Sequence, residues 1–187
     1  MKYNPDIHNR QSIRLRGYDY SQPGAYFVTI CIYHKQCLLG EIKDQTVMLN
    51  CYGEVVKFNW FNLTRVYPLI QLDSFVIMPN HIHGIIILTD HSHTLSKVVQ
   101  GFKTFSSRRI NQLRSLSKVP VWQRGYYEHI IRDENALQKI REYIVNNPYN
   151  WNQDEMHPSH QFPISQNMTT PLGRASAVNE TSPPEFN

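Results

Sequence analysis

Two histidines, His81 and His83, have the residue type and spacing that most directly indicate chemistry. They open the second apolar run of residues 74–88, SFVIMPNHIHGIIIL. If this run forms a strand, the two imidazoles project from the same face and Ile82 points to the other. Two imidazoles on one face can bind a divalent metal when a third ligand arrives from elsewhere in the fold.

Chance pairing is the alternative for such a short motif. The chain has nine histidines, and His91 and His93 form a second pair in a predicted loop. The apolar residues around His81 and His83 occupy both faces, which is typical of a central strand covered on both sides. This interior setting strengthens the metal interpretation, while chance pairing stays open as the more frequent explanation. We interpret His129, in another predicted strand, as a structural or substrate-contacting residue rather than a ligand.

A second candidate group lies on a predicted helix that starts after Asp133, a good N-cap residue, and runs to about residue 146. Tyr143 and Asn147 are four residues apart, so the phenol and the carboxamide lie on neighbouring turns of one face. A tyrosine hydroxyl can attack a phosphodiester, and an amide oxygen can ligate a hard divalent cation. Spacing alone favours a plainer interpretation, in which Tyr143 is a core residue and Asn147 ends the helix near Pro148.

The remaining elements follow from the spacing of apolar residues. Strands are predicted at 26–33, 69–78, 81–88 and 126–132, a short hairpin at 38–49, and helices at 52–66, 94–116 and 133–146. This order predicts an α+β fold of ferredoxin-like topology: an antiparallel sheet with helices packed mainly on one face.

Charge is distributed unevenly along the 187 residues, whose net charge is +4. Residues 152–187 contain four acidic residues and one arginine, which leaves +7 for residues 1–151. A compact domain this basic usually meets an anionic partner, most often nucleic acid, although charge kept for solubility is the alternative. We predict a basic arm at 1–24, one folded domain at 25–151, and a disordered polar tail at 152–187.

Three cysteines, Cys31, Cys37 and Cys51, show no CxxC spacing and are odd in number. They indicate reduced thiols rather than a disulfide framework or a zinc knuckle. The N-terminus has no apolar signal region, and no apolar run reaches the length of a membrane span. We therefore expect a soluble, cytoplasmic protein with no membrane partner.

Several segments together resemble the HUH single-tyrosine transposases. Residues 80–83, NHIH, are similar to the His-hydrophobic-His motif of that superfamily, and residues 142–148, EYIVNNP, resemble the nucleophile helix of its REP-associated tyrosine transposase branch. Further segments that resemble this branch are 14–20, 25–29, 75–83 and 122–129. The joint resemblance covers residues 10–151 in matching order and spacing.

This resemblance implies a ferredoxin-like domain that cuts and rejoins single-stranded DNA beside hairpin-forming palindromes. It implies that Tyr143 is the nucleophile and forms a 5′-phosphotyrosine adduct. It also implies that His81 and His83 bind Mg²⁺ or Mn²⁺, with Asn147 as the third ligand, where related insertion-sequence transposases usually carry glutamine. The expected setting is bacterial and nucleoid-associated, with single-stranded DNA hairpins as partners and either a homodimer or a monomer as the working form.

Basic and aromatic residues outside these motifs are candidates for DNA contact. Basic side chains of the arm and of the predicted helix at 94–116 suit phosphates, although a solvated basic face is the alternative. Aromatic rings suit stacking on unpaired bases. The candidate DNA-binding residues are Arg14, Arg16, Lys103, Arg108, Arg109, Trp122, Arg124, Tyr126 and His129.

Three rival functions share parts of this pattern. The first is a catalytically silent hairpin-binding protein, which the presence of Tyr143, both histidines and Asn147 argues against. The second is an HUH replication or nicking enzyme, which the small size and the branch-specific segments argue against. The third is a metal hydrolase that activates water, which predicts turnover without a covalent adduct.

Overall fold

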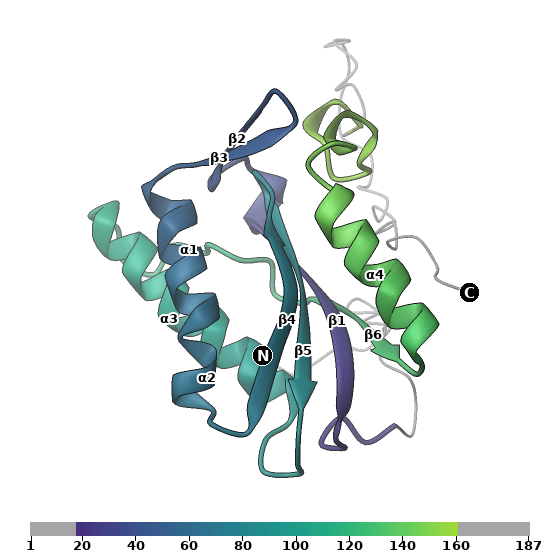
Figure 1. Cartoon of the computed structure of the whole chain (residues 1–187). Helices are drawn as coiled ribbons and strands as arrows, with labels where there is room; N and C mark the ends of the chain where they lie inside the picture. Colours follow the sequence, from purple (N-terminus) through teal and green to yellow (C-terminus); the bar gives the residue numbers. More distant parts are fainter. Residues whose placement is uncertain (1–17, 161–187) are drawn as a thin grey trace, which may run out of the picture.

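A four-stranded antiparallel sheet of order β4-β5-β1-β6 forms the centre of the fold (Figure 1). The computed structural model describes residues 18–160. The strands of this sheet are β1 (Gly24–Cys31), β4 (Ile70–Ile77), β5 (His81–Leu88) and β6 (Tyr127–Ile131). Since β5 lies between β4 and β1, the prediction of a central histidine strand is confirmed.

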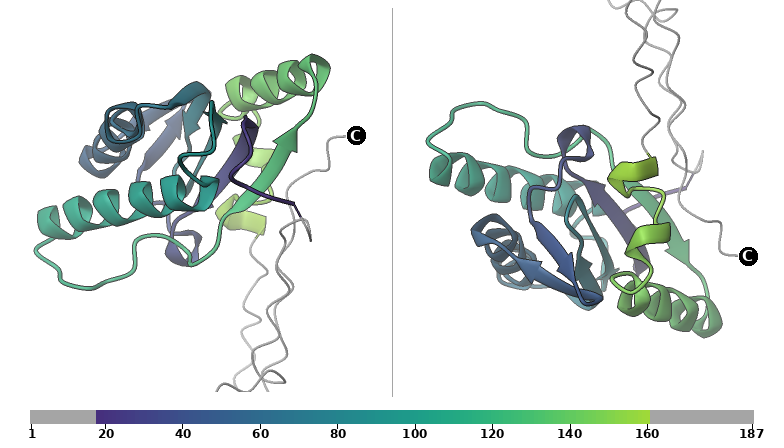
Figure 2. Two further views of the ribbon diagram at one scale, coloured as in Figure 1. Left: turned by 90° about the horizontal axis from the view of Figure 1, so that it is seen from below. Right: turned by 90° about the horizontal axis from the view of Figure 1, so that it is seen from above.

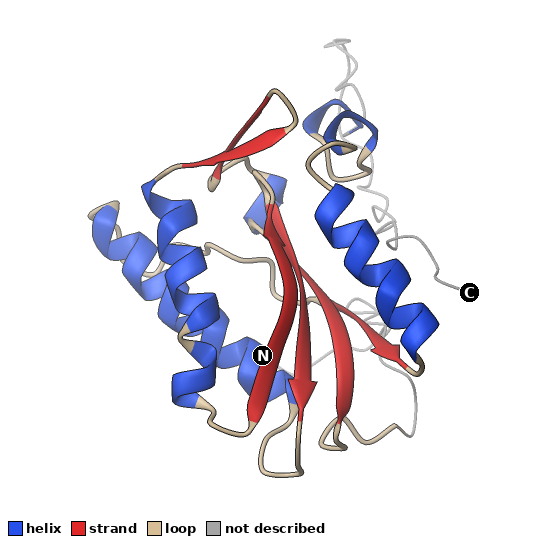
Figure 3. Ribbon diagram, viewed as in Figure 1, coloured by secondary structure: helices blue, strands red, loops and turns tan. Residues whose placement is uncertain are grey.

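The helices complete a ferredoxin-like order around this sheet (Figure 3). The helices are α1 (Cys51–Phe61), α2 (Leu63–Val66), α3 (Leu95–Leu113) and α4 (Glu134–Asn146). With α1 between β1 and β4 and α3 between β5 and β6, the chain runs strand, helix, strand, strand, helix, strand. The predicted α+β fold and ferredoxin-like topology are confirmed. A separate hairpin, β2 (Gly40–Lys43) with β3 (Thr46–Leu49), is inserted before α1.

The two faces of the sheet are covered unequally (Figure 2). Helices α1, α2 and α3 lie on one face and enclose the larger core, whose biggest side chains include Trp60 and Phe102. Helix α4 lies on the other face, where Ile140 and Ile144 pack on Phe27. The helices are therefore mainly on one face, as predicted, and α4 is the exception.

Strand β5 supplies side chains to both cores. Ile82 and Ile86 are buried in the larger core, whereas Ile85 is buried beneath α4. Because side chains alternate along a strand, this places His81 and His83 on the α4 side. The uninterrupted apolar run in the sequence is thus the result of burial on both faces.

Gly84 allows a tryptophan to lie against the sheet. The ring of Trp60 stacks on that of Phe75, with centroids 4.4 Å apart. A Cβ atom at position 84 would lie 2.4 Å from the Trp60 ring and 3.1 Å from Phe75. A side chain at this position would therefore displace the central stack of the larger core.

Residues 152–160 differ from the predicted disordered tail. The short helices η2 (Trp151–Gln153) and η3 (Pro158–His160) follow α4. Met156 anchors this segment, because its backbone oxygen accepts a hydrogen bond from Asn80 Nδ2 at 2.7 Å and its sulfur lies 3.3 Å from Cys31 Sγ. The remainder of the predicted tail and most of the predicted arm lie outside the described residues. In the part of the chain that the structure describes, no helix is both long and apolar enough to cross a membrane.

Replacing Gly84 by alanine should lower the free energy of unfolding by about 1–3 kcal/mol, because the Trp60 ring must leave its stack on Phe75. Urea denaturation followed by circular dichroism measures this loss. Gly125→Ala is the matched control, since a Cβ atom there meets nothing within 4 Å. Equal stability of Gly84→Ala and the unmodified protein would contradict the described packing.

Candidate active site

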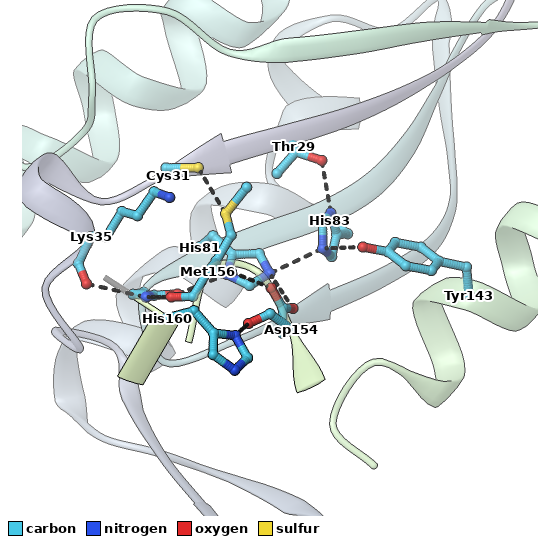
Figure 4. A network of polar contacts seen from close by, with 10 residues as sticks. Thr29, Cys31, Lys35, His81, His83, Tyr143, Asp154, Met156 and His160 are labelled. Atoms are coloured by element: carbon cyan, nitrogen blue, oxygen red, sulfur yellow. Dashed lines mark hydrogen bonds and ion pairs between the residues drawn. The ribbon is translucent and has the colours of Figure 1, made fainter. Parts of the chain in front are cut away.

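Both histidines of β5 are buried beneath α4 and the segment that follows it (Figure 4). Their exposed fractions are 0% for His81 and 1% for His83. The two Nε2 atoms are 3.0 Å apart. The prediction that both imidazoles project from one face of a strand is therefore confirmed.

The hydrogen bonds of Asn80 determine the tautomer of His81. Asn80 Nδ2 donates to the backbone oxygens of Lys35, at 3.1 Å, and Met156, at 2.7 Å. Its Oδ1 therefore faces His81 Nδ1, at 2.7 Å. Because an amide oxygen only accepts, Nδ1 of His81 carries the proton and Nε2 keeps a lone pair.

His83 has an equivalent support from β1. The hydroxyl of the buried Thr29 lies 2.8 Å from His83 Nδ1, where it can accept that proton and leave Nε2 with a lone pair. Burial lowers the pKa of His81 to about 3 and holds the pKa of His83 well below its ordinary value. Both rings are therefore neutral at pH 7. At their separation of 3.0 Å, the two Nε2 atoms can share a proton or a cation.

Tyr143 approaches the pair from α4. Its hydroxyl lies 3.3 Å from His83 Nε2, although the two residues are far apart in sequence. Burial raises the pKa of Tyr143 well above its ordinary value, and a hydrogen bond from the Asn147 side chain partly opposes that rise. The phenol is therefore protonated at neutral pH. Its ring packs edge-on against Phe27, with centroids 6.0 Å apart, which limits its movement.

Asp154 is a site residue that the sequence analysis missed. Its Oδ2 atom lies 3.7 Å from His81 Nε2. One ligand atom from each of His81, His83 and Asp154 falls within 4.8 Å of the others. Burial raises the pKa of the Asp154 carboxyl, as expected for an anion removed from water. Asp154 belongs to the segment predicted as a disordered tail. The signal that could have indicated it is its position, as an acidic residue soon after the helix that carries Tyr143.

A cavity of about 370 Å³ lies beside these groups. Its lining residues are His83, Tyr143, Asn147, Asn150, Gln153, Asp154, Glu155 and Met156. Asn147 Oδ1 and Asp154 Oδ2 are buried and have no hydrogen-bond partner among the described residues. Buried polar atoms are normally paired. Two imidazole nitrogens and two unpaired oxygens together form a donor set that fits a divalent cation.

Lys103, a predicted phosphate contact, has a different role. Its ammonium group donates to the backbone oxygens of Gln123, Arg124 and Gly125, at 2.5, 3.0 and 3.0 Å. An ammonium group has three protons, so these three acceptors use all of them. Lys103 therefore holds the segment before β6 against α3.

Trp122, a predicted stacking residue, is also unsuited to its predicted role. Only 5% of its surface is exposed, and its indole N–H donates to Ser106 Oγ at 2.9 Å. The ring packs against Phe102 inside the larger core. A base stacks on an accessible ring face, so the prediction that Trp122 stacks on DNA is wrong.

The other DNA-binding candidates are distributed over the molecule. Arg108 and Arg109 are exposed on α3, across the sheet from the histidines, and Arg109 lies over the Phe58 ring. Arg124 and Tyr126 border a cavity of about 650 Å³ between α3 and the segment before β6. His129 is on β6, where it pairs with Phe27 of β1. Arg14 and Arg16 lie outside the described residues.

A sheet-borne histidine pair facing a helical tyrosine is the arrangement that the resemblance to HUH single-tyrosine transposases implies. Comparison with known proteins agrees with this class. The family model described as "Transposase IS200 like" matches residues 24–147. The chain therefore belongs to the IS200-like transposase family, and the predicted resemblance to REP-associated tyrosine transposases is confirmed.

Two curated relatives come from Haemophilus influenzae. An uncharacterized protein is 41% identical, over 83% of this chain and 97% of its own length. A protein provisionally named a REP-associated tyrosine transposase is 26% identical, over 70% of this chain and 73% of its own length. A solved structure of a REP-associated tyrosine transposase bound to a REP hairpin has the same fold. It matches with a TM-score of 0.56 at 18% identity, over 91% of this chain and all of its own.

The metal-free protein should lose stability as the pH falls below about 6.5. The unfolded chain protonates His81 near its usual pKa of 6.5, whereas the folded chain binds that proton only near pH 3. Between these values the unfolded state holds more protons and is favoured. The raised pKa of Asp154 acts in the opposite direction and reduces the slope.

Urea midpoints at pH 7.5, 6.0 and 5.0 in a chelator measure this dependence. A His81→Asn variant is the control and should show a shallower slope. Midpoints that are equal at all three pH values would contradict the burial of neutral imidazoles.

Proposed function

We propose that this chain cleaves and rejoins single-stranded DNA next to hairpin-forming palindromes, with Tyr143 as the nucleophile. The observation that carries the proposal is the 3.3 Å separation between the Tyr143 hydroxyl and His83 Nε2. Tyr143 belongs to α4 and His83 to β5, so folding brings the phenol to a group of side chains whose donor set fits a divalent cation. The solved structure of a REP-associated tyrosine transposase bound to a REP hairpin supports DNA hairpins as the substrate class.

His81, His83 and Asp154 would hold the metal. The 3.7 Å separation of Asp154 Oδ2 from His81 Nε2 supports Asp154 as the third ligand. Asn147, which the family resemblance implies, borders the same cavity and is the alternative. Two imidazole nitrogens favour Mn²⁺ over Mg²⁺, because Mg²⁺ takes mainly oxygen ligands. When bound, a divalent cation supplies Lewis-acid stabilisation of the charge that develops around the scissile phosphate.

Asn147 would assist the nucleophile directly. Its Oδ1 has no hydrogen-bond partner among the described residues, so its hydrogen bond to Tyr143 uses Nδ2. A donor to the phenol oxygen stabilises the phenolate that forms as the proton leaves, and so it lowers the pKa of Tyr143. Burial keeps the phenol protonated until substrate arrives. Activation of Tyr143 would therefore occur within the assembled complex.

The covalent step exchanges one phosphodiester linkage for another. Tyr143 Oη loses its proton and attacks phosphorus, the bond to the 3′-oxygen breaks, and that oxygen takes up a proton in exchange to become a free 3′-hydroxyl. The protein then carries a 5′-phosphotyrosine. A second DNA 3′-hydroxyl can attack the same phosphorus and release Tyr143, so strand joining needs no nucleoside triphosphate. One tyrosine suffices for this exchange.

Incubation with Mn²⁺ and a labelled single-stranded hairpin oligonucleotide should give a protein–DNA band that survives denaturation. Tyr143→Phe should abolish this band, because the attacking oxygen is lost. Tyr149→Phe is the matched control, since Tyr149 is 66% exposed and lies one turn beyond the site. A chelator should prevent the adduct while leaving electrostatic DNA binding, which should weaken with added salt.

Persistence of the band in Tyr143→Phe would rule out Tyr143 as the nucleophile. Turnover of DNA without any adduct would indicate the water-activating hydrolase. Binding without cleavage across a library of hairpins would indicate a catalytically silent binding protein.

Replacing Asp154 by alanine should weaken Mn²⁺ binding by at least about tenfold, because one of three protein ligands is lost. Isothermal titration with Mn²⁺ measures the change. Glu155→Ala, which removes the neighbouring exposed carboxylate, should lower the affinity much less, because solvent screens an exposed charge. Asn147→Ala should reduce the rate of adduct formation more than it reduces Mn²⁺ affinity. A larger loss of affinity in Asn147→Ala than in Asp154→Ala would identify Asn147 as the third ligand.

A further inference from the structure

Helix α4 is joined to the far edge strand of the sheet by a bidentate ion pair. Arg141 Nε donates to Asp73 Oδ1 at 3.0 Å, and Arg141 Nη2 donates to Asp73 Oδ2 at 2.7 Å. Arg141 Nη1 also lies 3.4 Å from the carboxylate of Glu134, which is largely exposed. The Arg141 guanidinium holds the pKa of Asp73 at about 2, so the pair with Asp73 is ionised at neutral pH.

Asp73 faces α4 at an irregularity in β4. The pairing of β4 with β5 shifts register between Leu72 and Phe75. Both of these residues pack against the larger core although they are three positions apart, whereas regular alternation would place them on opposite faces. Asp73 follows Leu72 and so faces α4, where its Oδ1 also accepts from Ser74 N at 2.6 Å. The extra residue at the shift returns Phe75 to the larger core. The register of β4 against β5 therefore shifts next to the residue that pairs with Arg141.

The ion pair and the nucleophile lie on opposite sides of the apolar stripe of α4. At about 100° per residue, Arg141 falls on one side of Ile140 and Ile144, and Tyr143 falls on the other. Apolar contacts are non-directional, so the two isoleucines alone tolerate rotation or sliding of the helix. A planar guanidinium on a carboxylate fixes both distance and orientation. Any rotation of α4 that moved Tyr143 would break the contact with Asp73.

We propose that Arg141 is a positioning residue for Tyr143, and that its pair with Asp73 sets the rotation and depth of α4. The ion pair holds the tyrosine hydroxyl against the histidine pair, at the separation from which it can attack a bound phosphate. The catalytic part of this inference rests on the proposed function, whereas the geometric part concerns only the placement of Tyr143 beside His83. These rings are close enough for direct measurement, with centroids 5.1 Å apart.

Nuclear magnetic resonance on protein labelled at tyrosine and histidine tests the geometry without any reaction. A cross-relaxation signal between the Tyr143 and His83 rings should be present in the unmodified protein and should weaken or vanish in Arg141→Gln and in Asp73→Asn. The double variant Asp73→Arg with Arg141→Asp, which restores the pair with exchanged charges, should recover it. Glu134→Gln removes the exposed partner of Arg141 and should leave the signal unchanged.

Adduct formation under single-turnover conditions tests the consequence. Arg141→Gln should slow the step by about tenfold to a hundredfold, which is the cost of displacing a reacting group by about 1 Å. Mn²⁺ affinity should fall less than the rate does, because His81 and His83 belong to β5 and not to α4. The exchanged pair should recover most of the rate, which a loss of general stability would not do.

Two results would overturn the proposal. One is an unchanged ring-to-ring signal in both Arg141→Gln and Asp73→Asn. The other is a rate in Arg141→Gln equal to that of the unmodified protein. Should a single variant fail to fold, Arg141→Lys keeps the charge but loses the bidentate geometry, and it should show the same weakening of the signal. Absence of any adduct in the unmodified protein would overturn the proposed function, and the resonance signals would still decide whether the ion pair places Tyr143.

Discussion

The site depends on keeping two imidazoles neutral and oriented inside a protein. A charged histidine is costly to bury, so His81 and His83 retain their lone pairs at pH 7. Asn80 and Thr29 occupy their Nδ1 atoms, and the Nε2 atoms consequently face each other. Every other feature of the site follows from this arrangement, because it leaves a concentrated set of electron pairs that is favourable only with a cation or a proton donor beside it.

The two faces of the sheet differ in role: one contains the larger core, and the other contains the candidate active site. The face covered by α1 and α3 contains the larger core, with the Trp60–Phe75 stack above Gly84. The opposite face carries one helix and a small apolar cluster, and this is where the polar side chains of β5 project. The larger core on the other side of the sheet supplies most of the apolar burial that stabilises a fold with these histidines inside.

The segment after α4 joins parts of the molecule that are far apart in sequence. Met156 contacts Asn80 and Cys31, and Trp151 packs near His81, with ring centroids 6.1 Å apart. These contacts bring Asp154 beside the histidine pair. Asn80 thus has two functions, since its amide group both orients His81 and anchors the segment that carries the acidic ligand candidate.

The pattern of neighbouring residues in the sequence predicted much of the fold and part of the candidate site. Alternation in β5 predicted that both histidines share a face, four-residue spacing predicted that Tyr143 and Asn147 share a helix face, and the order of elements predicted the topology. The tertiary structure decided which distant side chains meet, and the sequence pattern does not predict this. Three contacts join segments that are far apart in sequence: Asp154 lies beside the histidine pair, Lys103 donates to three backbone oxygens, and Arg141 pairs with Asp73. Periodicity reports which way a side chain points, because that depends on neighbouring residues alone. It does not report what the side chain meets, because that depends on how the layers pack.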